Sequence, residues 1–145
     1  MKIIPATLKN LSDLAPLFDG YRVFYKQVSD LEKATRFLKE RFQKNDSIIF
    51  MAFEGASAVG FIQLYPSFSS VSMQRIYILN DLFVHPEARG KGIGEALLNT
   101  TKQFAISQKA KGLTLETDST NPAQKLYERL GWTKDTEVFH YTWKV

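Results

Sequence analysis

The sequence has no cysteine and only two histidines among its 145 residues. Without cysteine the chain can form no disulfide, no thiolate metal site and no acyl-cysteine intermediate. His85 precedes a proline and His140 lies near the carboxyl end, and neither belongs to a Ser-His-Asp spacing or a two-histidine metal motif. Hydrolase and metalloenzyme chemistry therefore lack support, and we predict no metal site.

Long apolar runs are also missing. No stretch approaches the roughly 18 residues that a membrane-spanning helix needs. The opening MKIIPATLKN has a proline and a lysine where a secretory signal would need a longer apolar block. We therefore expect a cytoplasmic protein without a membrane partner.

The composition is that of a globular domain, with 44% hydrophobic and 23% charged residues. A chain of this length buries roughly 68–70% of its unfolded surface, which is enough for a core without disulfides. No repeat, low-complexity tract or linker interrupts it, so we predict one domain over residues 1–145. The net charge of +4 favours anionic partners such as nucleotides, phosphates or nucleic acid.

The spacing of apolar residues predicts an alternation of strands and helices. Strands are expected over 2–6, 47–53, 58–65, 75–84, 113–117 and 137–144, and helices within 12–28, 29–42, 92–112 and 122–131. A serine-rich loop is expected over 67–72. Antiparallel signals come first and a strand-loop-helix-strand crossover follows, which predicts a mixed α/β sheet flanked by four helices.

The segment Arg89-Gly90-Lys91-Gly92-Ile93-Gly94 joins the strongest predicted strand to a predicted helix. Glycines allow a tight turn and a close approach to a ligand. The unpaired N–H groups of the first helical turn, together with the helix dipole, form an anion site beside the two cations. We expect a phosphate or pyrophosphate to bind here.

Three known phosphate-binding patterns are candidates for this loop. The spacing of an ATPase P-loop is absent. The dinucleotide fingerprint fails because Glu95 stands where its third glycine would fall. The pattern Arg/Gln-x-x-Gly-x-Gly/Ala fits Arg89, Gly92 and Gly94, and the alternative is a simple connector with basic residues by chance.

Two motifs now identify a resemblance that covers nearly the whole chain. The segments NDLFVHPEARGKGIGEALL (80–98) and AQKLYERLGW (123–132) resemble, in order and separation, the GNAT superfamily of acyl-CoA-dependent N-acyltransferases. The segments YRVFY, LYPSFSS and DTEVFHYTW are similar to a bacterial subgroup related to the yeast histone and polyamine acetyltransferases. The resemblance implies a mixed, mostly antiparallel sheet of about six or seven strands with four helices.

The resemblance also implies acetyl-CoA as cosubstrate, with its pyrophosphate at the glycine-rich loop and its pantetheine arm paired to a strand edge. The family often has an asparagine seven residues before its tyrosine, where this chain has Thr120, with Asn121 one residue later. Either residue is expected to touch the arm. The implied cofactor-binding residues are Leu82, Phe83, Val84, Arg89, Gly90, Lys91, Gly92, Ile93, Gly94, Thr120 and Asn121.

Thioester aminolysis needs a proton acceptor, a donor for the developing oxyanion and an acid for the leaving sulfur. The resemblance assigns the acid to Tyr127 and the donor to the N–H of Leu82 or Phe83. Asp81 is the first candidate for the base. Because no cysteine is present, direct attack in a ternary complex is the simplest route. The structural alternatives are a core aromatic for Tyr127, and a solvated strand end or a salt bridge for Asp81.

The acceptor amine is expected beside the first two helices and the 64–70 segment. Tyr21, Tyr25 and Tyr65 are the aromatic candidates for its walls, and Glu116 and Asp118 would attract a cation or share the role of base. Packing between the helices and the sheet is the alternative for the tyrosines. A polyamine, a lysine side chain, another small amine and an antibiotic all fit this chemistry.

Two other functions are compatible with parts of the sequence. A non-catalytic CoA-binding regulator would keep the glycine-rich loop without turnover. A basic nucleic-acid-binding module is suggested by the sequence pI of about 9.3, but the lysines and arginines are scattered along the chain. By analogy with the family, the last strand would also pair with a second copy to form a homodimer.

Overall fold

The computed structural model describes residues 1–145, which form five strands and four α-helices. Two short 3-10 turns, η1 (Leu8–Asn10) and η2 (Pro86–Ala88), complete the secondary structure. None of the helices has the length and apolar character of a bilayer-crossing segment. In chain order the main elements are β1 (Lys2–Pro5), α1 (Leu11–Phe24), α2 (Leu31–Lys44), β2 (Ile48–Glu54), β3 (Ser57–Ser69), β4 (Gln74–Val84), α3 (Ile93–Ser107), β5 (Gly112–Leu115) and α4 (Gln124–Arg129).

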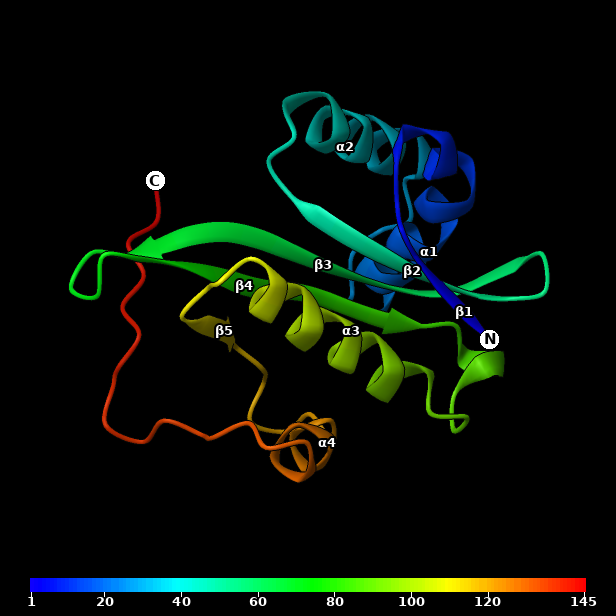
Figure 1. Cartoon of the computed structure of the whole chain (residues 1–145). Helices are drawn as coiled ribbons and strands as arrows, with labels where there is room; N and C mark the ends of the chain where they lie inside the picture. The colour runs from blue at the N-terminus through cyan, green and yellow to red at the C-terminus, as the bar shows by residue number, and fades with distance from the viewer.

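The five strands form one sheet in the order β1-β2-β3-β4-β5 (Figure 1). Neighbouring strands are antiparallel except for β4 and β5, which are parallel. The parallel pair follows from the crossover through α3, because parallel neighbours need a long connection. The predicted class, a mixed and mostly antiparallel sheet flanked by four helices, is confirmed.

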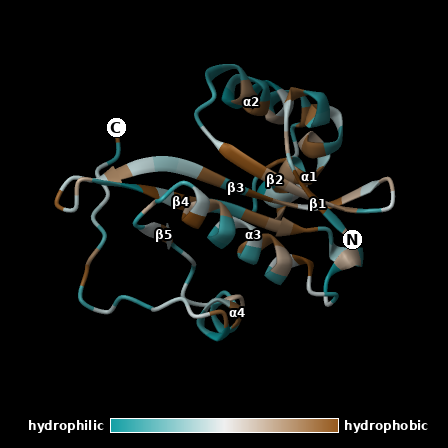
Figure 2. Cartoon of the chain, in the orientation of Figure 1, coloured by the Kyte–Doolittle hydropathy of each residue, from teal (hydrophilic) through white to brown (hydrophobic).

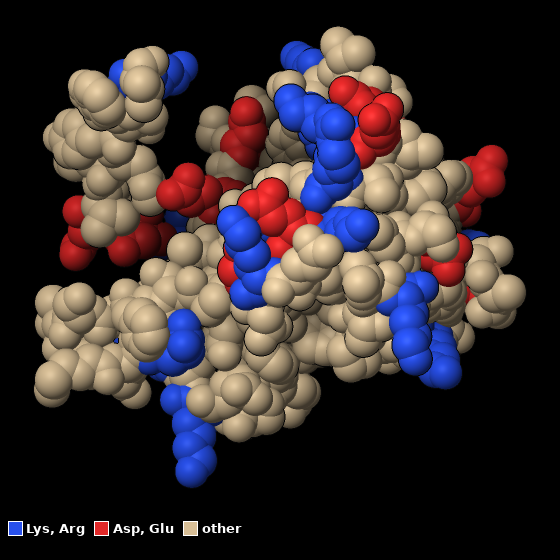
Figure 3. Space-filling view, turned by 90° about the horizontal axis from the view of Figure 1, so that it is seen from above, with Lys and Arg blue, Asp and Glu red and all other residues tan.

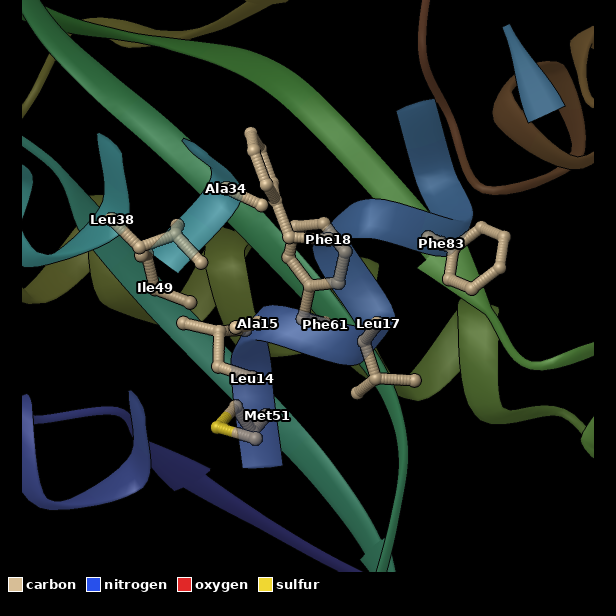
Figure 4. Packing of buried hydrophobic residues seen from close by; sticks show 10 residues of the cluster. All are labelled: Leu14, Ala15, Leu17, Phe18, Ala34, Leu38, Ile49, Met51, Phe61 and Phe83. Carbon is tan, nitrogen blue, oxygen red and sulfur yellow. The ribbon is translucent and has the colours of Figure 1, made fainter. Parts of the chain in front are cut away.

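The core lies in two layers, one on each face of the sheet. Helices α1 and α2 cover one face, where Phe18 lies 6.1 Å from Phe61 between ring centroids (Figure 4). Helix α3 covers the other face, where Leu97 and Leu98 are fully buried. Figure 2 shows the most hydrophobic residues on the central strands and the most hydrophilic on the outer helix surfaces. The sheet is therefore held between two helical layers.

The predicted loop over 67–72 is partly wrong. Strand β3 continues through Ser69, and only a short turn separates it from β4. Phe68 pairs in register with Arg75, whose guanidinium lies 4.1 Å from the centre of the phenyl ring. This cross-strand contact extends the hairpin through a segment whose serines alone favour a loop.

The predicted strand over 137–144 is also wrong, so the sheet has five strands instead of six or seven. The segment has no ladder partner, and Phe139, Tyr141 and Trp143 are 85%, 93% and 84% exposed. The side chain of His140 lies 3.1 Å from Glu116, the residue that follows β5. Alternation describes which face a side chain takes, but a strand also needs a neighbour for its backbone hydrogen bonds.

Strands β4 and β5 stay paired for only part of β4. Their register runs from Ile76 opposite Gly112 to Leu79 opposite Leu115, and β4 then continues alone to Val84. On its other side β4 remains paired with β3 along its whole length. The register shifts between Gln63 and Leu64, which leaves Asn80 as the extra residue of a β-bulge where the two strands part.

Gly60 provides a test of how closely β3 and β4 pack at this open end. A Cβ atom on Gly60 would lie 2.9 Å from the carbonyl oxygen of Phe83, whereas one on Gly112 would meet nothing within 4 Å. We expect Gly60→Ala to destabilise the fold by about 1–3 kcal/mol, since the backbone of β4 must shift. Chemical denaturation of both variants checks this, and a Gly60→Ala variant no less stable than Gly112→Ala would contradict the packing described.

Candidate active site

A cavity of about 520 Å³ opens where β4 and β5 part. Its walls come from the free end of β4, the loop before α3, the end of β5, the segment leading into α4, and the last residues of α1. The predicted residues that line it are Tyr25, Leu82, Phe83, Val84, Arg89, Gly90, Gly92, Ile93, Gly94, Glu116, Asn121 and Tyr127. One cavity thus brings together residues from five separate parts of the sequence.

The free edge of β4 presents main-chain groups to this cavity. The N–H of His85 donates to the carbonyl of Val59 at 2.8 Å, so the main chain of His85 faces β3. Because alternate residues of a strand face opposite sides, Phe83 also faces β3, and Leu82 and Val84 face the open edge. The edge therefore offers Leu82 and Val84 for main-chain pairing, and leaves Phe83 without a free N–H.

The loop before α3 turns through Gly90 and Gly92, whose φ angles are +78° and +79°. Gly92 is the N-cap of α3, and a Cβ atom there would meet open space. The first N–H groups of the helix have no intrahelical partner. Together with the positive end of the helix dipole, they make this corner of the cavity suitable for a phosphate group.

Arg89 connects this loop to the end of β4 and to α1. Its Nε donates to the carbonyl of Val84 at 2.9 Å, and its guanidinium lies 5.6 Å and 5.5 Å from the ring centres of Phe24 and Phe83. The cation is thereby held at the cavity wall. Lys91 does not line the cavity, because its Nζ lies 3.6 Å from the carboxylate of Glu54.

Helix α4 brings Tyr127 to the opposite wall, with its ring 6.1 Å from that of Trp132. Burial raises the pKa of the Tyr127 phenol, and the neighbouring Tyr25 raises it further. The phenol therefore keeps its proton over a wider pH range than an exposed tyrosine does. Asn121 caps this segment, since its Oδ1 accepts the N–H of Ala123 at 3.0 Å, and it also lines the cavity.

Asp81 lies behind the wall instead of on it. The carboxylate is 2% exposed, and it accepts hydrogen bonds from Asn80 Nδ2 at 2.6 Å and Gln63 Nε2 at 2.5 Å. Burial raises the pKa of Asp81, while the hydrogen bonds from Asn80, Gln63 and Tyr21 lower it. Neither predicted structural alternative, a solvated strand end or a salt bridge, is what the structure shows, since Asp81 is buried and no ion pair includes it.

Five further predicted residues lie outside the cavity wall or are engaged elsewhere. Thr120 donates its N–H and hydroxyl to Asp118 at 2.9 Å and 2.7 Å, and these bonds lower the pKa of that exposed carboxyl. Neither residue lines the cavity, and neither do Tyr21 and Tyr65. Glu116 does line it, but its carboxylate lies 3.1 Å from His140.

The cavity also contains residues that the sequence did not single out. Asn80, the bulge residue, lines it beside Leu82. Glu95 and Arg129, on α3 and α4, lie 2.9 Å apart and link the two helices at its wall. A pattern of β-propensity does not reveal a bulge, and the sequence separation of 34 residues conceals the ion pair.

Charges of both signs are mixed on one face of the molecule. On the face seen in Figure 3, lysine and arginine side chains alternate with aspartate and glutamate and do not gather into one patch. No group of three or more His, Asp or Glu side chains is arranged to hold a metal ion. The cavity, with its glycine-rich loop and open strand edge, is therefore the candidate active site.

Comparison with known proteins assigns this chain to a family. The family model described as "Acetyltransferase (GNAT) family" matches residues 14–132. An uncharacterised N-acetyltransferase of Bacillus subtilis, YhfO, is 51% identical over 97% of this chain and 95% of its own length. A probable acetyltransferase of Haemophilus influenzae is 36% identical over 80% of each chain. The crystal structure of a probable acetyltransferase is similar with a TM-score of 0.94 and 41% identity, over 100% of this chain and 98% of the other.

These similarities define an acyltransferase enzyme. More particularly, the chain belongs to the GNAT family of acetyltransferases, as its two motifs predict. The family uses acetyl-CoA as cosubstrate. The reading as a regulator without catalysis is set aside by this assignment.

The buried Asp81 predicts how stability changes with pH. Because burial raises its pKa above the value in the unfolded chain, keeping the carboxylate ionised costs stability once the pH exceeds the folded-state pKa. We expect Asp81→Asn, which removes this charge, to unfold at a higher temperature than the wild type at pH 7. The difference should shrink as the pH falls and Asp81 takes up a proton. Thermal unfolding of both proteins across a pH series measures this difference. An advantage of Asp81→Asn that is smaller at pH 7 than in acid would contradict the predicted direction.

Proposed function

We propose that this chain, as a single domain over residues 1–145, transfers an acetyl group from acetyl-CoA to a primary amine by direct attack in a ternary complex. The observation that carries the proposal is the open edge of β4, which leads straight into the phosphate-binding start of α3. An extended arm paired to the edge would end with its diphosphate at the helix, so one ligand can use both features.

The cosubstrate would be held mainly by the backbone. Leu82 and Val84 would pair with the pantetheine arm, and the N–H groups that follow Gly92 would bind the pyrophosphate. Arg89, already fixed by Val84, would add a positive charge beside it. Asn121 is the better placed of the two alternatives for a contact with the arm, because it lines the cavity and Thr120 is bonded to Asp118.

The chemistry would use one donor on each side of the thioester. The N–H of Leu82 faces the open edge, so it would donate to the carbonyl oxygen as that oxygen gains charge. Tyr127, whose pKa is raised by burial, would give its proton to the departing sulfur. Acetyl-CoA supplies the activated acetyl group, and the chain supplies orientation and protons.

The acceptor would enter beside the end of α1. Tyr25 and Glu116 line the cavity there, and an aromatic ring and a carboxylate suit a cationic amine. Streptothricin acetyltransferase of Escherichia coli is 27% identical over 92% of this chain and 80% of its own length. Its name supports a small-molecule amine as one class of acceptor, alongside a polyamine or a lysine side chain.

The glycine-rich loop can be tested with a matched pair of variants. Gly92 and Gly55 both have positive φ angles, +79° and +60°, and a Cβ on either meets nothing within 4 Å. Alanine at each position therefore brings similar backbone strain. We expect only Gly92→Ala to weaken acetyl-CoA binding, by tenfold or more (about 1.4 kcal/mol), as measured by calorimetry. Equal affinities for the two variants would argue against a role for the loop in binding.

The proposed acid can be tested by removing one oxygen. We expect Tyr127→Phe to lower kcat by about 10²-fold or more, as is typical for the loss of a general acid, with little change in acetyl-CoA affinity. Tyr141→Phe, on the 93% exposed tyrosine of the tail, is the control. Thiol release with a panel of amines measures both variants, and full activity of Tyr127→Phe would remove Tyr127 from the mechanism.

A further inference from the structure

The carboxylate of Asp81 is buried without a cation. Its hydrogen-bond donors are neutral, the amides of Asn80 and Gln63 and the phenol of Tyr21, and no lysine, arginine or histidine forms an ion pair with it. Burying an ionised carboxyl without a cation costs folding free energy, and such groups are typical of functional sites. The observation calls for a partner that arrives during the reaction.

Tyr21 connects this carboxylate to the cavity wall. Its hydroxyl donates to the carbonyl of Asn80 at 3.1 Å and lies within hydrogen-bonding reach of Asp81. Asn80 is the bulge residue that lines the cavity. Neither Asp81 nor Tyr21 lines the cavity itself, but the Tyr21 hydroxyl bonds to Asn80, and the Tyr21 ring lies 5.0 Å from that of Tyr25, which also lines it. The Tyr21 phenol therefore lies directly behind the cavity wall, beside Asp81 and next to the proposed place of the amine.

Gln63, on the neighbouring strand β3, fixes the side chain of Asp81 by a hydrogen bond. The two residues are paired in register across β3 and β4, and Gln63 is fully buried. Its Nε2 donates to Asp81 Oδ2, while its Oε1 has no hydrogen-bond partner. An unpaired buried oxygen weakens a core, so the residue has a purpose other than packing. The purpose that the geometry offers is orientation of the carboxylate.

We propose that Tyr21 takes the proton released by the acceptor amine and passes its own proton to Asp81, and that Gln63 is the positioning residue that keeps Asp81 within reach of Tyr21. This inference rests on the proposed function. In this inference the amine gives its proton to Tyr21 and not directly to Asp81, the predicted base. Gln63, which belongs to no sequence motif, acquires a role in positioning.

Every bond and every proton in this step is accounted for. The amine nitrogen bonds to the acetyl carbon, and the carbon–sulfur bond breaks. The amine proton goes to the Tyr21 oxygen as the Tyr21 proton goes to Asp81, while Tyr127 protonates the sulfur. The products are the N-acetylated amine and CoA thiol, and Asp81 then loses a proton to solvent as Tyr127 regains one.

The groups around Asp81 agree with this direction of transfer. Burial and the charge of Asp81 raise the pKa of Tyr21, so the phenol is neutral until it relays a proton. Burial, with a further contribution from Asp81, raises the pKa of Tyr65 to about 12, so that phenol is neutral too. The other titratable or charged groups that face this region are Tyr25 just after α1, Arg41 on α2, Asp46 before β2, Glu116 after β5 and Tyr127 on α4.

The test begins with one hydroxyl. We expect Tyr21→Phe to lower kcat by about 10²-fold, while acetyl-CoA affinity and thermal stability stay near the wild-type values. Tyr77→Phe is the matched control, because Tyr77 is a buried tyrosine of β4 that packs against Phe104 on the opposite face of the sheet. If Tyr21→Phe keeps its kcat, or if affinity and stability fall in step with it, the relay is wrong.

The second variant tests positioning. Gln63→Met keeps the length of the side chain but removes its donor, so the ionised form of Asp81 loses a hydrogen bond and its pKa rises. The acidic limb of the pH profile of kcat/KM should then move upward by about one pH unit. Gln63→Glu offers partial rescue when protonated, since its carboxyl can again donate. An unmoved limb in Gln63→Met would overturn the positioning role.

Failure of the inference is distinguishable from failure of the proposed function. A wild-type enzyme that releases no thiol with any amine overturns the proposed function and the relay with it. A wild-type enzyme that turns over, with a Tyr21→Phe variant equally active, overturns the relay alone.

Discussion

The parting of β4 from β5 is the constraint on which the rest of the site depends. The strands pair as far as Leu79 and Leu115, and five residues of β4 then continue with one edge unpaired. Backbone groups left open inside a fold must find a partner, and an extended ligand arm is the partner that this edge fits. The bulge at Asn80 lies where the strands part, and beyond it Asp81 and Leu82 pair in regular register with Gln63 and Ile62.

The two core layers keep this opening from closing. On one face, α1 and α2 pack against Phe61 and Phe83, and on the other, α3 packs against Ile62 and Leu82. The same α3 begins beside the open edge and supplies the anion site. A single helix therefore both supports the sheet and presents the N-terminus at which we propose that the phosphate binds, so the loop and the strand edge come together through one helical connection.

The sequence predicted the class of fold and most of the cavity wall because both are local in origin. Hydrophobic periodicity marks the strands and helices, and the run from Arg89 to Gly94 is one continuous segment. The predicted last strand failed because a period of two says nothing about a pairing partner. The extended hairpin was missed because its serines favour a loop, while the stacking of Arg75 on Phe68 depends on register.

The residues that sequence could not place are those whose surroundings come from distant segments. Asp81 was expected on the wall, and it lies behind Tyr21, which is 60 positions earlier in the chain. Gln63 carries no motif, and its contact with Asp81 appears only once β3 and β4 are in register. The position of Lys91 also depends on a distant segment, because its side chain pairs with Glu54 of β2 and does not line the cavity.

The open edge can be observed directly by residue-resolved amide hydrogen exchange, in the free protein and with acetyl-CoA. The account predicts that the amides of Leu82 and Val84 exchange readily in the free protein and become protected when the ligand binds, whereas Phe83 is protected in both states. Exchange at Leu82 and Val84 that acetyl-CoA leaves unchanged, while it protects residues elsewhere, would contradict the account.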